Sequence, residues 1–277
     1  MTKNNNHDTV TALSEEDATG EIANIFADIR TTMQIPMLTS IWRTLAESEA
    51  DLASTWGAVR PMYATGQPEA ALARLRSDAV FPEFEPVSLN ELANADVSSE
   101  DLPAIKGIVG AYTRSNSLNL LTQTGLVVDR SETYSDYPAV ETASVSDDTP
   151  RLLPRDEISD SVWQSILDVN SYGVNGPESG LATLYRHLAY WPGLLSLMQS
   201  RMATAQEQGA ISKGATSVSK IALEEGARLA HHRDEVQLDG MSDDAMNRVA
   251  HYVDGPFTVA RMVNAGTALV RWLDAVD

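Results

Sequence analysis

Few segments of this sequence gather side chains that could do chemistry, and the densest is His231-His232-Arg233-Asp234-Glu235. His231 and Glu235 have the four-residue spacing at which two ligands on one helix could share a metal ion. Adjacent His residues point about 100° apart on a helix, however, and no third ligand is evident. We therefore predict no metal site and expect a solvated helix end, where His favours the negative end of the helix dipole.

Two arginines in otherwise apolar segments, Arg43 and Arg186, are candidates for binding an organic acid. A guanidinium can hold a carboxylate through two parallel hydrogen bonds. The alternative is an internal ion pair, for instance with Asp28 or Asp168. The sequence leaves both interpretations open.

Composition excludes several classes of function. The chain has no Cys, which excludes disulfides, thiolate catalysis and Cys-ligated metals. Its 39 acidic residues against 20 basic ones give a net charge of -19, which disfavours nucleic acid and anionic membranes as partners. No apolar run approaches a membrane span, and residues 1–11 lack a signal core. We expect a cytoplasmic protein with no nucleic acid or membrane partner.

The acidity also suggests an environment. Self-repulsion among so many acidic groups is tolerable where salt screens it, so we favour a halophilic, salt-rich cytoplasm. The alternative is an ordinary acidic protein.

The elements that must position any site are helices. Apolar residues recur at helical spacing along nearly the whole chain, and alternating β-branched runs are absent, so we predict an all-α protein. With 277 residues and 43% hydrophobic content, the chain can bury a core. The predicted helices cover residues 22–33, 40–59, 69–80, 102–128 (as two helices divided near 114–117), 160–170, 181–206, 212–231, 242–253 and 257–276.

The two halves of the sequence resemble each other at a nearly constant offset of 140 to 143 residues. The matching pairs are Ile41–Ala46 with Leu184–Ala189, Asp28-Ile29 with Asp168-Val169, and Ala111-Tyr112 with His251-Tyr252. We predict two similar helical halves of about 140 residues that form an internal pseudo-dimer. Two unrelated bundles with similar periodicity are the alternative.

The repeat divides the chain into four parts. We predict a polar tail (1–19), a first helical repeat (20–128), an acidic Ser/Pro-rich linker (129–157) and a second repeat (158–277). A pocket between the repeats would be concave and mostly apolar.

Three residues in or near such a pocket allow two interpretations each. Asn116 could cap a helix that starts at Leu118 or supply a polar group to the pocket. Trp42 and Tyr185, which are equivalent in the repeat, could be core aromatics or pocket walls.

A set of short motifs spread over residues 20–274 resembles the group I DL-2-haloacid dehalogenases, the DehI-type halocarboxylic acid dehalogenases. The motifs are Asp28-Ile29-Arg30, Ile35-Pro36, Leu45-Ala46, the helix with Tyr112, Asn116 and Leu120-Leu121, Leu152-Leu153-Pro154, Gly176-Pro177, and Leu188-Ala189-Tyr190-Trp191-Pro192.

This resemblance implies an all-α pseudo-dimer that hydrolyses 2-haloalkanoic acids to 2-hydroxy acids without cofactor or metal. In the family, a carboxylate activates a water that attacks C2 and expels halide, and an Asn helps to hold the water. Asn116 stands at the position of that Asn. Such chemistry needs a base within hydrogen-bond reach of the water.

The catalytic Asp of the family has no counterpart at the matching position. Its place is taken by Leu184 when counted back from Trp191-Pro192, or by Gly180 when counted forward from Gly176-Pro177. Thr183 and Glu178 are the remaining candidates near it, although a Glu in such a turn is usually solvated.

The resemblance also implies a set of pocket residues. They are Met37 and Ser40, which replace two aromatics of the family, and Leu184. Further candidates for the pocket wall come from the internal repeat: Trp42, Tyr185 and Tyr252.

Two classes of function follow. The first is a 2-haloacid dehalogenase with a small 2-haloacid substrate, and the second is a non-catalytic or re-purposed relative that binds a small apolar carboxylic acid between its halves. A relative of the alkylhydroperoxidase-like helical proteins is a third possibility, but their redox chemistry uses a Cys pair that this chain lacks. The protein could also form a homodimer.

Overall fold

The chain is all-α, as predicted. A computed structural model describes residues 13–140, 149–174 and 180–277, and within these ranges it contains helices and no strand. The α-helices are α1 (Gly20–Met33), α2 (Ser40–Leu45), α3 (Glu49–Ala64), α4 (Gln67–Asp78), α5 (Leu89–Asn94), α6 (Leu102–Val127), α7 (Asp160–Asn170), α8 (Thr183–His187), α9 (Pro192–Glu207), α10 (Ala210–Leu229), α11 (Glu235–Asp239), α12 (Asp243–Val253) and α13 (Val259–Asp274). Three short 3-10 helices add η1 (Arg155–Glu157), η2 (Leu188–Tyr190) and η3 (Ala230–His232).

Two of the long predicted helices are each broken into shorter ones. The segment 40–59 divides into α2 and α3 because the Ser48 hydroxyl accepts the Asp51 N–H and starts a new helix. The segment 181–206 divides into α8, η2 and α9, and Pro192 begins α9 as the first helical residue. Apolar periodicity continues across both breaks, which is why the pattern alone missed them.

The predicted break near residues 114–117 is wrong, because α6 is continuous through it. Two polar side chains there bond to carbonyls of the preceding turn without ending the helix: Thr113 donates to the Val109 carbonyl, and Ser117 donates to the Thr113 carbonyl. Arg114 is buried and forms an ion pair with Glu69. Asn116 therefore lies inside a helix, and its interpretation as a helix cap is also wrong.

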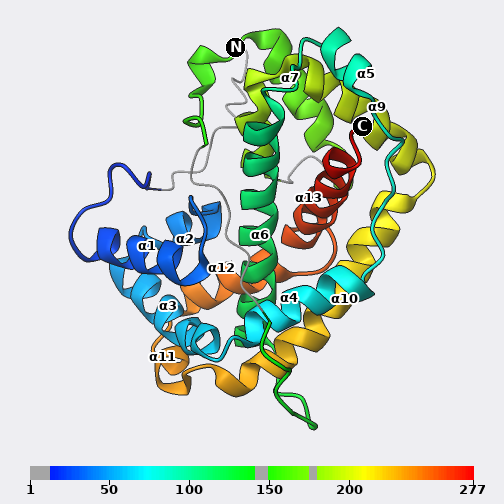
Figure 1. Cartoon of the computed structure of the whole chain (residues 1–277). Coiled ribbons are helices and arrows are strands. Elements are labelled where there is room, and N and C mark those ends of the chain that lie inside the picture. The colour runs from blue at the N-terminus through cyan, green and yellow to red at the C-terminus, as the bar shows by residue number, and fades with distance from the viewer. Residues whose placement is uncertain (1–12, 141–148, 175–179) are drawn as a thin grey trace, which may run out of the picture.

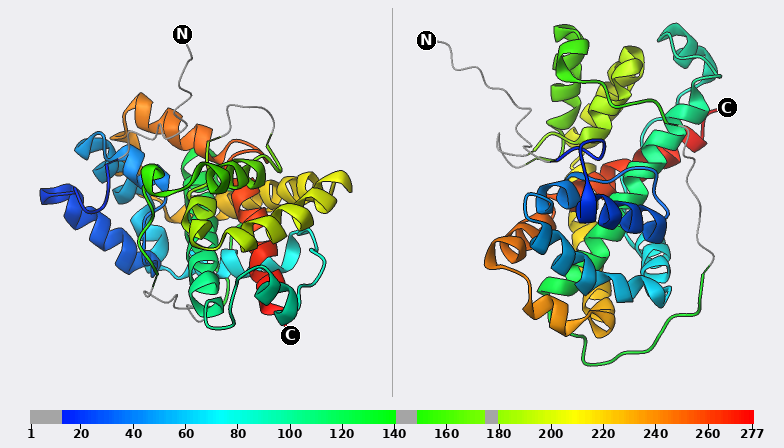
Figure 2. Two further views of the ribbon diagram at one scale, coloured as in Figure 1. Left: turned by 90° about the horizontal axis from the view of Figure 1, so that it is seen from above. Right: turned by 90° about the vertical axis from the view of Figure 1, so that its left-hand side faces the viewer.

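Helix α6 runs through the middle of the molecule and joins two hydrophobic clusters (Figure 1). The first cluster contains α1 to α4, the carboxyl-terminal part of α6, and residues from α10, α12 and the start of α13. The second contains α5, the first part of α6, α7 to α9 and the rest of α13. In Figure 2 the helices that carry these clusters form two ends of the molecule, and each end contains helices from early and late parts of the chain.

The order of the helices repeats along the chain with the offset seen in the sequence. Helices α3 and α9 both have 16 residues and begin 143 residues apart. The next pair, α4 and α10, begins at the same offset, and each follows a left-handed glycine, Gly66 or Gly209. Arg43 donates to the Leu13 carbonyl, as Arg186 does to that of Leu153. These matches support the repeat, while the pseudo-dimer stays a prediction.

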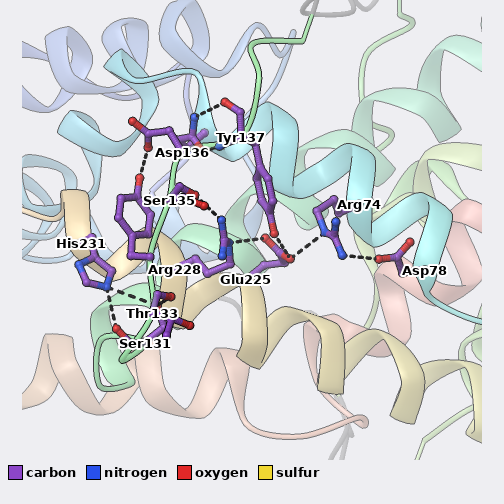
Figure 3. Close-up of polar contacts among 12 residues, drawn as sticks. Arg74, Asp78, Ser131, Thr133, Ser135, Asp136, Tyr137, Glu225, Arg228 and His231 are labelled. Carbon is purple, nitrogen blue, oxygen red and sulfur yellow. Dashed lines mark hydrogen bonds and ion pairs between the residues drawn. The ribbon is translucent and has the colours of Figure 1, made fainter.

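The first part of the predicted linker lies against α10 and α4. We refer to residues 131–137 as the strap. The Tyr137 hydroxyl donates to Glu225 at 2.9 Å, and Arg74 and Arg228 point at the same carboxylate (Figure 3). The side chain of Gln67 bonds both the N–H and the carbonyl of Tyr137. Burial raises the pKa of Glu225 above its usual value. The strap is thus fixed by a half-buried polar cluster.

The segment 231–235 forms no metal site of the kind its spacing allowed. His231 lies in η3 and Glu235 begins α11, so a break separates them. His231 bonds to Ser131, and Glu235 forms ion pairs with Arg130 and Arg233. Within the described ranges, no three His, Asp or Glu side chains are close enough to hold a metal ion. No helix in the same ranges is long and apolar enough to cross a membrane.

Candidate functional site

A small cavity lies where residues from both predicted repeats meet. Its volume, counted as space open to the centre of a water molecule, is about 30 Å³. Five segments supply its walls: the start of α2, the middle of α6, the loop before α8, α8 itself and α13. The lining residues are Thr39, Ser40, Tyr112, Asn116, Leu181, Ala182, Thr183, Leu184, Tyr185 and Met262. This space holds a few waters or a very small organic acid.

Asn116 is held in the cavity wall by a hydrogen-bond network. The Tyr252 hydroxyl donates to Asn116 Oδ1 at 3.3 Å. One helical turn further along α6, Asn119 donates from Nδ2 to the Thr39 hydroxyl at 2.7 Å and accepts from Trp42 Nε1 at 2.9 Å. Because Oδ1 of Asn116 accepts from Tyr252, its amide N–H groups are the ones left to meet a ligand.

The segment before α8 is fixed from two sides. The Ala182 N–H donates to Asn170 Oδ1 at 2.9 Å, and Arg261 donates to the Gly180 carbonyl at 2.9 Å. This anchoring brings Thr183, Leu184 and Tyr185 to the cavity. Thr183 contributes a hydroxyl there, and Leu184 makes the wall apolar.

Five of the predicted site residues therefore meet in one cavity: Ser40, Asn116, Thr183, Leu184 and Tyr185. No Asp or Glu is among its described lining residues, so the family's carboxylate has no replacement in that part of the wall.

The other predicted site residues lie elsewhere. Tyr252 reaches the site through Asn116. Trp42 is fully buried in the first hydrophobic cluster, with its ring edge-on to Trp56 at 5.6 Å, and is a core residue rather than a cavity wall. Met37 packs against the second cluster and is not among the lining residues. Glu178 lies outside the described residues.

A buried pair that sequence analysis missed adjoins the cavity. His187 Nε2 is 2.6 Å from the Pro150 carbonyl oxygen, which can only accept, so Nε2 carries the proton. Nδ1 is then an acceptor, and the Tyr112 hydroxyl donates to it at 3.3 Å. Burial lowers the pKa of His187 and raises that of Tyr112, which keeps both groups neutral. No sequence signal links His187 to Tyr112, because 75 residues separate them.

A buried cation, Arg261, lies beside this part of the molecule. Arg261, next to Met262 on α13, is 3% exposed and bonds only backbone carbonyls within the described ranges, where it forms no ion pair. Its Nε has no hydrogen-bond partner there. Arg43, Glu15 and Arg186 all act electrostatically on Tyr112, and the glutamate opposes the two arginines. Cationic groups near a cavity favour an anionic ligand.

Comparison with known proteins gives a match in structure but none in sequence. No protein-family model matches the chain, and no curated protein does. Among solved structures, a D-2-halacid dehalogenase mutant superposes with a TM-score of 0.74 at 16% identity, covering 95% of each chain. A D-2-haloacid dehalogenase mutant in complex with D-2-CPA gives 0.71 at 15% identity, covering 96% of this chain and 95% of that one.

A third structure, the D-2-haloacid dehalogenase in complex with L-LA, gives a TM-score of 0.66 at 15% identity and covers 95% of this chain and 94% of that one. At this level of identity the likeness establishes the fold. The chain has a 2-haloacid dehalogenase-like fold over nearly its whole length.

Proposed function

We propose that this protein is a cofactor-independent 2-haloacid dehalogenase, which hydrolyses small 2-haloalkanoic acids to 2-hydroxy acids by direct attack of water on C2. The observation that carries the proposal is the convergence of Asn116, Thr183 and Ser40 on one small cavity in a dehalogenase-like fold.

The chemistry of the cavity fits a short acid. Leu181, Leu184 and Met262 provide apolar contacts for an alkyl group and a halogen, whereas Asn116 and the hydroxyls can hold a water. A volume of about 30 Å³ favours a short acid over a long one. A confined water that is already oriented toward C2 saves much of the entropic part of the barrier.

Arg261 supports an anionic substrate. Among the described residues its buried guanidinium has no carboxylate partner, and a carboxylate bound nearby would lower the cost of burying that charge. Electrostatic attraction would therefore draw the substrate carboxylate toward the cavity.

The test is bromide release from each enantiomer of 2-bromopropanoate, measured in molar NaCl so that product halide differs from the salt. Asn116→Ala should lower kcat about 100-fold or more, because the water loses its hydrogen-bond partner. Asn247→Ala, at an exposed position in α12, is the matched control and should retain the native rate.

A single turnover in ¹⁸O-labelled water tests the route. Direct attack puts the label into the hydroxy acid on the first turnover, with inversion at C2. Unlabelled product on the first turnover would contradict direct attack, and absence of bromide from the folded native chain would contradict the whole proposal.

The alternative function is binding of a small apolar carboxylic acid without turnover. The observation that favours it is the lack of Asp or Glu among the described lining residues. Calorimetric binding of 2-methylpropanoate together with no bromide release would support this alternative.

A further inference from the structure

We infer that Tyr112 and His187 together act as the base for the cavity water, in place of the family's carboxylate. The inference rests on the proposed function. It starts from the arrangement of three groups: a tyrosine in the cavity wall, a histidine that accepts its proton, and the Pro150 carbonyl that orients the histidine. Enzymes activate a hydroxyl group by placing a base next to it and a third group that orients the base. These three groups have the same arrangement.

The orientation of His187 is set by its surroundings. The Pro150 carbonyl fixes the proton on Nε2 and leaves the lone pair of Nδ1 facing the Tyr112 hydroxyl. His187 is 3% exposed, so bulk water does not compete for Nδ1. Its ring also packs edge-on against the Tyr112 ring, with the ring centroids 5.8 Å apart. This contact helps to hold the two side chains in position.

The position of Tyr112 connects this pair to the water. Tyr112 lies four residues before Asn116 on α6, so both side chains project from the same face of the helix into the cavity wall. A water held by the Asn116 amide would therefore lie beside Tyr112.

The proposed step balances as follows. The water oxygen bonds to C2 while the carbon–halogen bond breaks, and the bonding electrons leave with the halide. One water proton passes to the Tyr112 oxygen as the Tyr112 proton passes to His187 Nδ1. The products are the 2-hydroxy acid, halide and a His187 imidazolium, which then returns its proton to solvent through Tyr112.

The charged groups around the pair are compatible with this step. Arg43 and Arg186 favour the deprotonated form of Tyr112, and Glu15 opposes it. Burial lowers the pKa of His187, so the ring is unprotonated and able to accept a proton at neutral pH and somewhat below. The native activity should therefore fall in acid, as His187 becomes protonated.

Three variants test the pair. Tyr112→Phe keeps the ring and removes the hydroxyl, and His187→Gln keeps a donor for the Pro150 carbonyl. Each should lower kcat about 100-fold or more with little change in KM. The double variant should be no slower than either single one, because the two residues act as a unit. Both single variants should also lose the acid limb of the pH profile.

Tyr185→Phe is the matched control, since Tyr185 is another buried tyrosine of the cavity wall. Whatever its rate, it should keep the acid limb. A spectroscopic readout is independent of turnover: ¹⁵N-histidine spectra, in which His187→Gln assigns one of five signals, should show His187 in the Nε2–H form. Its pKa should move in Tyr112→Phe.

The outcomes separate the two proposals. If the native chain releases bromide and both single variants keep its rate and acid limb, the Tyr112–His187 inference is wrong and the dehalogenase proposal stands. A His187 signal with the proton on Nδ1 also overturns the inference. If the native chain releases no bromide, both proposals fall.

Discussion

Replacing Gly266 with Ala should loosen the contact between α13 and α6, the two helices that carry Met262 and Asn116. A Cβ added at Gly266 would lie 2.4 Å from the Thr113 hydroxyl oxygen and 3.3 Å from its Cβ. Thr113 cannot turn away freely, because its hydroxyl donates to the Val109 carbonyl at 2.6 Å and is buried. Separating the helices or breaking that bond costs about 1–3 kcal/mol.

Gly107→Ala is the control for this change. Gly107 also lies in a helix, and an added Cβ meets nothing within 4 Å. Both substitutions gain about 1 kcal/mol of helix propensity, so the difference between the variants isolates the contact. We expect Gly107→Ala to be more stable than Gly266→Ala by about 1–3 kcal/mol in urea unfolding. Each kcal/mol corresponds to roughly 2–4 °C in Tm. Equal stability of the two variants would refute this account of the packing.

Four further predictions concern charge, pH and the strap. Glu69→Gln should destabilise the fold by about 3–5 kcal/mol in urea, because Arg114 keeps a buried charge without its partner. Burial lowers the pKa of His187 below its value of 6.5 in the unfolded chain, so stability present above pH 6.5 is lost as pH falls through the lowered pKa. Thermal melts should show a smaller loss in His187→Gln. Gln67→Ala should speed hydrogen exchange at the Tyr137 amide about tenfold or more, since the side chain makes two hydrogen bonds to that residue. Finally, the Tm should rise between 0.1 and 2 M NaCl if screening of the net charge of -19 matters, and a flat response would favour an ordinary acidic protein.

Helical periodicity predicted the fold class and several helix bounds well. It identified α7 at its observed limits, Asp160–Asn170, because Ser159 caps a short amphipathic segment with a clear apolar face. It missed α5 and α11, which are too short to show a period. The sequence pattern also wrongly divided α6 into two helices. Ser, Asn and Thr are poor helix formers, and the sequence does not show the hydrogen bonds that these side chains make within a helix.

The candidate site could be predicted only in part. Asn116, Thr183 and Leu184 could be selected by their spacing from the short sequence motifs, and the structure brings them to one cavity. Tyr112 and His187 carry no such signal as a pair, because their contact depends on how α8 packs against α6. The neutral state of His187 likewise depends on burial and on a single carbonyl oxygen.

The sharing of both hydrophobic clusters between early and late parts of the chain has a consequence for synthesis on the ribosome. Helix α13 supplies Val259 and Val263 to the first cluster and Leu269 and Trp272 to the second. A nascent chain from which α13 has not yet emerged therefore lacks part of both cores and exposes apolar surface on each. Neither core can be completed before α13 has left the ribosome, and loss of α13 would unfold both ends of the molecule together.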